Sequence, residues 1–129
     1  MSTAIEKLLA AQMEFGRLIC EQIRSNIDKL ELTDTQSVVA PSFSSAEFTL
    51  VTDPYTQQQN LVGYWFNPKR QRTGQIQFNS DGSCYAEYDI VQNHPRRPDL
   101  FIEAISVWGH IDNLKSEARL LELPGSEES

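Results

Sequence analysis

Basic side chains concentrate in two short segments of an otherwise acidic sequence. The 129 residues include 18 acidic and 11 basic side chains, and segments 67–73 and 92–99 hold five of the basic ones. Lysine and arginine at this density suit a phosphate, a carboxylate-bearing ligand or an acidic patch on a partner protein. Pro95 and Pro98 would stiffen the second segment and lower the entropy lost on binding. The candidate anion- or partner-binding residues are Lys69, Arg70, Arg72, His94, Arg96 and Arg97.

The same segments also fit an ordinary role as solvated hairpin tips, where charged residues are common. The binding hypothesis predicts that Ala at Arg70, Arg96 and Arg97 weakens partner binding and leaves the melting temperature nearly unchanged. The net charge of −7 argues against general binding to nucleic acids or membrane surfaces, because both are anionic.

Histidine and cysteine residues form no recognisable catalytic or metal-binding set. His94 and His110 are expected at opposite ends of a sheet, too far apart to share a metal within one chain. Cys84 and His110 would face opposite sides of that sheet, which disfavours a nucleophile pair.

The carboxylates give weak support for enzyme chemistry. Glu87, Asp89 and Glu103 fall close together on adjacent predicted strands, with Glu103 expected on the core-facing side. Paired carboxylates on a solvated sheet face usually carry out no acid–base chemistry. A nucleophile-elbow serine and a glycine-rich phosphate loop are both missing from the sequence. We therefore expect a non-catalytic protein without a metal or a cofactor.

The elements that position these residues begin with one long helix at 3–31. Thr3 precedes the apolar run and Glu6 follows three residues later, which is the spacing of a capping box. Apolar residues then recur with helical spacing, so this helix can cover one face of a sheet. Met13 and Cys20 widen the apolar stripe on one side beyond what a sheet requires. Either the following loop folds over this extra surface, or a second partner such as a copy of the same helix covers it.

From residue 46 onward the periodicity changes from helical to alternating. A crossover loop at 33–45, pinned by Val38, Val39 and Phe43, joins the helix to this region. A sixth run, 115–123, favours a strand over a short helix because Gly and Pro bracket it. The strands are predicted at Ala46–Thr52, Leu61–Phe66, Gln75–Asn79, Ser83–Val91, Leu100–Trp108 and Lys115–Leu123.

The resulting fold class is α+β, with the long N-terminal helix packed on one face of an antiparallel β-meander of five to six strands. Residues 1–123 form a single domain, and 124–129 are expected to be a disordered acidic tail. Alternate connections of a meander lie at the same end of the sheet, so the two basic segments are expected to be neighbours.

The turn at 80–82 sets the register of one hairpin. A two-residue loop would place Phe78 opposite Tyr85 and mix polar with apolar side chains on the core face. A three-residue loop with a left-handed Gly82 pairs Phe78 with Cys84 and keeps one face apolar. The core of this hairpin is then Ile76, Phe78, Cys84, Ala86, Tyr88 and Ile90.

The next hairpin follows if Val91 lies opposite Leu100, which places Cys84 opposite Val107 and Ala86 opposite Ile105. The other sheet face then carries a group of apolar and aromatic side chains among acidic ones. Tyrosine and tryptophan are frequent anchors of protein interfaces, although the last strand or a loop would also suffice to cover them. The candidate docking face is Tyr85, Ile102 and Trp108.

The chain start and the cysteines indicate a cytoplasmic protein. Glu6 and Lys7 interrupt the first turns, so we expect no secretory signal, and no apolar run reaches the length of a membrane span. Cys20 and Cys84 are expected as buried thiols in a reducing compartment.

The leading functional hypothesis is a small non-catalytic protein that binds another macromolecule through the basic loop end and the outer sheet face, as an accessory, assembly or adaptor factor. Its expected partner is another protein with an acidic patch, and a homodimer is also open. The second hypothesis is a small-ligand binder or lyase-like protein with a cavity between helix and sheet. A third is weak nucleic-acid binding through the basic loops, with Trp65 or Tyr64 exposed for stacking. The cavity would be lined by Phe15, Ile19, Tyr64, Phe78 and Tyr88.

Overall fold

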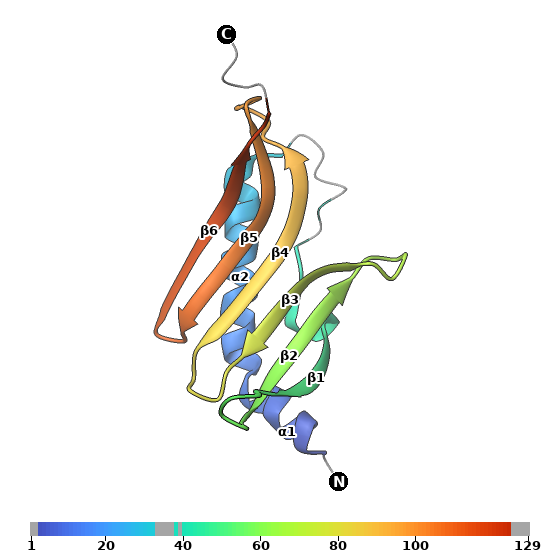
Figure 1. Ribbon diagram of the computed structural model, residues 1–129, viewed down its shortest axis with the longest axis vertical. Coiled ribbons are helices and arrows are strands. Elements are labelled where there is room, and N and C mark those ends of the chain that lie inside the picture. Colours follow the sequence, from blue (N-terminus) through green and yellow to red (C-terminus); the bar gives the residue numbers. More distant parts are fainter. Residues whose placement is uncertain (1–2, 33–37, 39, 125–129) are drawn as a thin grey trace.

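The N-terminal region forms two consecutive helices that lie behind a curved antiparallel sheet (Figure 1). The computed structural model describes residues 3–32, 38 and 40–124. Helix α1 spans Ala4–Ala11 and helix α2 spans Met13–Leu30. The Thr3 side chain accepts a hydrogen bond from the Glu6 amide at 3.2 Å, so the predicted N-terminal cap is confirmed.

The prediction of one uninterrupted helix over 3–31 was wrong at Gln12. This residue leaves helical geometry (φ −99°, ψ 5°), although its amide still donates to the carbonyls of Leu8 and Leu9. The bend lets α1 contact the first strand while α2 runs along the last two. A straight helix of this length would extend about 40 Å, whereas the bend keeps Ile5 and Leu9 packed against the core.

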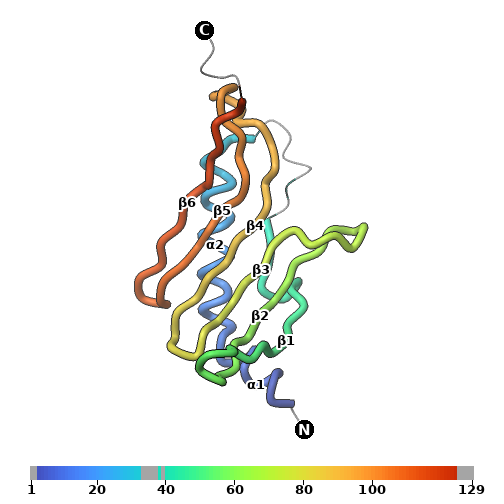
Figure 2. Tube along the Cα trace, in the orientation of Figure 1, coloured from blue at the N-terminus to red at the C-terminus, as the bar shows by residue number. Residues whose placement is uncertain are grey.

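Within the described residues, six strands form one antiparallel meander in the order β1 to β6, which the trace in Figure 2 follows from green to red. The prediction of an α+β meander is confirmed, and the run at 115–123 is a strand. A short 3-10 helix, η1, spans Phe43–Ser45 and leads into the sheet. The strands are β1 Glu47–Thr52, β2 Gln59–Phe66, β3 Arg72–Phe78, β4 Cys84–Asn93, β5 Leu100–His110 and β6 Asn113–Glu122.

The register predicted for the β3–β4 hairpin is confirmed. Phe78 pairs with Cys84 and Ile76 with Ala86. Gly82 has a φ of +90°, the left-handed conformation that a three-residue loop requires and that glycine adopts without a steric penalty. The six predicted core residues of this hairpin are buried in the core or packed against it.

The register predicted for β4 and β5 was wrong by two residues. Ala86 lies opposite Val107, and Cys84 lies opposite Gly109. A shift of two residues keeps each side chain on the same face, so Ile105 and Val107 still point to the core, where both are fully buried. A β-bulge after Asp89 then changes the register.

The core lies between α2 and the inner sheet face. Phe15 of α2 meets Phe78 of β3 edge to face, with ring centroids 5.5 Å apart, and Ile19 and Ile23 are fully buried. Cys20 and Cys84 are free and buried, as expected. Burial raises the pKa of the Cys20 thiol to about 11 and that of Cys84 to about 12.

The crossover segment is fixed to the sheet where the structure describes it. The Trp65 indole N–H donates to the Ser42 carbonyl at 2.9 Å. Val38 belongs to the core and Phe43 packs against it, as predicted. Val39 and the tail beyond Pro124 fall outside the described residues. None of the helices described here is long and apolar enough to cross a membrane.

Candidate functional site

The sheet face opposite α2 is the first candidate binding surface. In the part of the chain that the structure describes, both helices pack on the inner face, and Figure 1 shows no element over the outer one. Tyr85 and Trp108 are direct partners across β4 and β5 on this outer face. Both side chains are half-buried, so they form an aromatic pair that is anchored in the sheet and still accessible.

Charged groups lie beside this aromatic pair. Glu87 accepts hydrogen bonds from the Tyr85 hydroxyl and from Arg119 Nη2, each at 3.0 Å. Partial burial raises the pKa of Asp89, and the nearby Glu87 carboxylate raises it further, against the opposing guanidinium groups of Arg119 and Arg72. The outer face therefore carries charges of both signs. An added positive charge would stabilise the ionised form of Asp89, which its present surroundings disfavour.

Two polar atoms beneath these side chains lack partners among the described residues. The Ser106 Oγ and the Arg119 Nε are both buried without a hydrogen bond. Ser106 lies directly opposite Glu87 and is 4% exposed. Unsatisfied buried polar atoms are uncommon, so the centre of this face has hydrogen-bonding capacity that the described residues do not use.

Ile102 does not belong to the outer face. It is 0% exposed and part of the core cluster, which corrects its prediction as a docking residue. The reason is a second bulge, because the pairing of β5 with β6 skips Glu103 between Ile102 and Ala104. One extra residue in a strand reverses the side-chain alternation beyond it. Glu103 is half-buried and acts on Asp89 electrostatically.

The two basic segments lie apart. Figure 1 shows the β2–β3 connection projecting sideways, whereas the β4–β5 connection lies at the far end of the sheet near the C-terminus. The pairing of β3 with β4 ends at Gly74 and Tyr88, whereas β4 continues to Asn93, so the β4–β5 connection lies farther along the sheet than the β2–β3 connection. The expectation that these loops are neighbours forming one rim was therefore wrong.

The β2–β3 segment is held by local contacts. The Arg70 guanidinium pairs with Glu47 at 2.5 Å and lies 4.3 Å from the Phe66 ring centre, and this pairing lowers the pKa of Glu47. Arg72 lies 5.2 Å from the ring centre of Tyr64. The Lys69 side chain is exposed and forms no ion pair with the residues that the structure describes.

The β4–β5 segment secures the end of α2. Arg96 Nη1 donates to the Leu30 carbonyl at 3.2 Å and pairs with Glu31 at 2.8 Å. Arg97 pairs with Asp99 at 3.1 Å and lowers the pKa of that carboxyl. These contacts indicate a structural role for Arg96, so we expect its replacement to lower the melting temperature rather than leave it unchanged.

His94 also has a local role, because its Nδ1 accepts a hydrogen bond from the Arg96 amide at 3.1 Å. Three or more His, Cys, Asp or Glu side chains suited to a metal do not come together anywhere in residues 3–32, 38 and 40–124.

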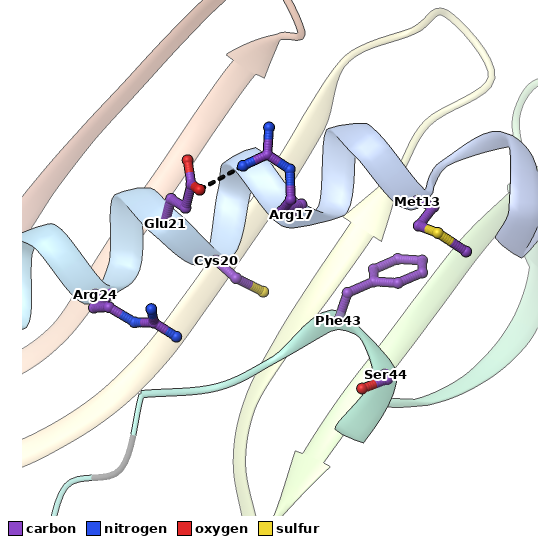
Figure 3. Close-up of a pocket in the computed structure, with 7 residues that line it drawn as sticks. All are labelled: Met13, Arg17, Cys20, Glu21, Arg24, Phe43 and Ser44. Carbon is purple, nitrogen blue, oxygen red and sulfur yellow. Dashed lines mark hydrogen bonds and ion pairs between the residues drawn. The ribbon is translucent and has the colours of Figure 1, made fainter.

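A groove between α2 and η1 was not anticipated as a binding site. It has a volume of about 350 Å³. Figure 3 shows Met13 and Phe43 at one end and Arg24 at the other, with Cys20 between them. The wide apolar stripe at Met13 and Cys20 was its signal in the sequence. Phe43 covers part of that stripe, as the loop hypothesis proposed, and leaves the groove beside it.

The predicted cavity between helix and sheet does not have the expected lining. Phe15, Ile19 and Phe78 are buried in the core, whereas Tyr64 pairs with Gln75 on the outer face. Trp65 is only 3% exposed and is not available for stacking on a base.

No protein-family model matches the sequence, and no solved structure matches the chain. The outer sheet face and the α2–η1 groove are thus interpreted from their own residues.

Proposed function

We propose that this chain is a non-catalytic cytoplasmic protein that binds another protein through its outer sheet face. The single observation that carries the proposal is the half-buried pair of Tyr85 and Trp108 on a face that no described element covers. Aromatic side chains held in this way give large contact area at a small entropy loss, and they are the residues most often found at interface hot spots.

The charge pattern favours a protein over a nucleic acid as the partner. Glu87, Asp89 and Glu117 lie on or beside this face together with Arg119 and Lys115. An anionic backbone would be repelled by the carboxylates, whereas a protein surface can present both signs of charge. A partner Lys or Arg opposite Asp89 would stabilise its ionised form. The basic segments, lying apart, would contact only the margins of such a partner.

Site-specific photocrosslinking tests the proposal in native cell extract. A photoreactive amino acid at Gln77, which neighbours Tyr85 on the outer face, is expected to form an adduct with one protein. The same group at Ser25, exposed on α2, is the control and should not capture that protein. Equal adducts from both positions would contradict docking on the outer face.

A pair of matched variants tests the role of the aromatic side chains. Tyr85→Ala with Trp108→Ala should abolish the Gln77 adduct, while Tyr55→Ala should leave it unchanged, because Tyr55 is 93% exposed in a different loop. Circular dichroism verifies that each variant is folded. An adduct that survives the double substitution would refute the assignment, and an adduct with a second copy of the chain would identify the partner as a homodimer.

A further inference from the structure

The groove between α2 and η1 has an apolar part and a cationic part. Its walls are Met13, which is 61% exposed, together with Phe43 and the buried Cys20. Because burial raises the pKa of Cys20 to about 11, its thiol is neutral at physiological pH and behaves as an apolar surface. An exposed methionine beside an aromatic ring is an adaptable wall for apolar groups.

The shape of the groove depends on the absence of a side chain at Gly16. A Cβ there would lie 2.1 Å from Phe43 Cδ1, so only glycine lets the ring rest against α2. The Phe43 ring is held from its other side by Phe48 and Phe78, at centroid distances of 5.1 and 6.0 Å. The aromatic wall is therefore fixed by packing before any ligand arrives.

The two arginines that line the groove differ in their ion pairs. Arg17 pairs with both Glu14 and Glu21 at 2.5 Å, so its guanidinium is already engaged. Arg24 forms no ion pair with any carboxylate among the described residues, and its charge is close enough to lower the pKa of Cys20 against the effect of burial. Figure 3 shows the Arg24 side chain extending along the same side of α2 as Cys20. Within residues 3–32, 38 and 40–124, one cation without an ion-pair partner thus lies at the end of the apolar groove.

We propose that this groove binds a small amphiphilic carboxylate, with its apolar part against Met13 and Phe43 and its carboxylate on Arg24. The volume of about 350 Å³ falls in the range of roughly 300–1,000 Å³ that small-molecule sites occupy. A carboxylate matches the two parallel N–H groups of one guanidinium. A dianionic phosphate fits less well, because Arg24 is the one arginine of the described groove lining without an ion pair and Glu21 also lines the groove.

Methionine NMR tests this proposal with octanoate as the probe. The chain has two methionines, Met1 and Met13, so methyl-¹³C labelling gives one reporter in the groove and one internal reference. Titration with octanoate below its micelle concentration should move the Met13 signal saturably and leave Met1 in place. Octanol, which has the same chain without the charge, should bind roughly tenfold more weakly.

Matched charge variants locate the carboxylate. Arg24→Gln should weaken octanoate binding by roughly tenfold or more, while Lys29→Gln on the same helix should change it by less than about twofold. An unmoved Met13 signal, equal affinity for octanol, or unchanged binding by Arg24→Gln would each overturn the proposal. A Met13 signal that shifts with protein concentration alone would also overturn it, since a second copy would then occupy the groove.

Discussion

Replacing Gly16 by alanine is expected to destabilise the protein, although alanine is the better helix former. In a solvent-exposed helix this substitution stabilises the folded state by about 1 kcal/mol. At Gly16, however, the added Cβ would lie 2.1 Å from Cδ1 and 2.6 Å from Cε1 of Phe43. Relieving that overlap means moving an aromatic ring packed against two others, and overpacking of this kind costs roughly 2 kcal/mol. The free energy of unfolding is therefore expected to fall by about 1 kcal/mol, which is the difference between the overpacking cost and the helix-propensity gain.

A double-mutant cycle with Phe43→Ala isolates the steric effect. Without the ring, Gly16→Ala should stabilise by about 1 kcal/mol, so the coupling between the two positions is about 2 kcal/mol. Urea denaturation followed by circular dichroism measures each free energy of unfolding. The difference between Ser25→Ala and Ser25→Gly, at an exposed site of α2, gives the propensity effect in this helix. A stabilising Gly16→Ala with the same magnitude in both backgrounds would refute the packing account.

Three further outcomes are expected. Arg96→Ala should lower the melting temperature by a few degrees, because the Arg96 guanidinium donates hydrogen bonds to carbonyls at the end of α2 and interacts favourably with the helix dipole. Arg97→Ala should lower the melting temperature less. Equal effects of the two substitutions would argue against the capping role. Asp89→Asn should raise the free energy of unfolding at neutral pH. Because the pKa of Asp89 is raised in the folded protein, the protonated carboxyl stabilises the fold at low pH, and this stabilisation is lost as the pH rises through the folded-state pKa. Thermal melts against pH should show the gain disappearing below the ordinary carboxyl range, and a gain independent of pH would contradict this cause. Trp65→Phe should destabilise by at least about 1 kcal/mol, measured by urea denaturation, since it removes the bond to the Ser42 carbonyl; unaltered stability would show that this bond is not needed.

Local regularities in the sequence predicted most of the secondary structure. Alternation of apolar and polar residues located several of the strands, since a strand with one buried face must repeat every two residues. The sixth strand was favoured because Gly and Pro bracket its run. Gly82 fixed the β3–β4 register, because few other residues adopt the positive φ that a three-residue loop requires. The capping side chain of Thr3 marked the start of α1. Each of these features depends on residues within a few positions of one another.

The candidate sites were predicted less well, because non-local contacts define them. The two basic segments were expected to be adjacent from topology alone, yet β4 extends beyond its pairing with β3 and carries the second segment away from the first. Tyr85 and Trp108 were placed correctly on the outer face, since both lie in the regular part of the β4–β5 pairing, away from the bulges after Asp89 and at Glu103. The α2–η1 groove was missed, because it arises where Phe43 happens to meet Gly16 across a long stretch of chain.

The sequence by itself determined the order of helix and sheet, the approximate positions of the strands and which stretches are charged. Only the tertiary structure decided which partner each charged side chain contacts and on which sheet face particular residues lie. The bulge at Glu103 places the Ile102 side chain in the core. Arg96 donates a hydrogen bond to a carbonyl at the end of α2 and so caps that helix. The physical reason is that periodicity reports local geometry, whereas a bulge, a cap or a groove is set by the free energy of packing between segments distant in the chain.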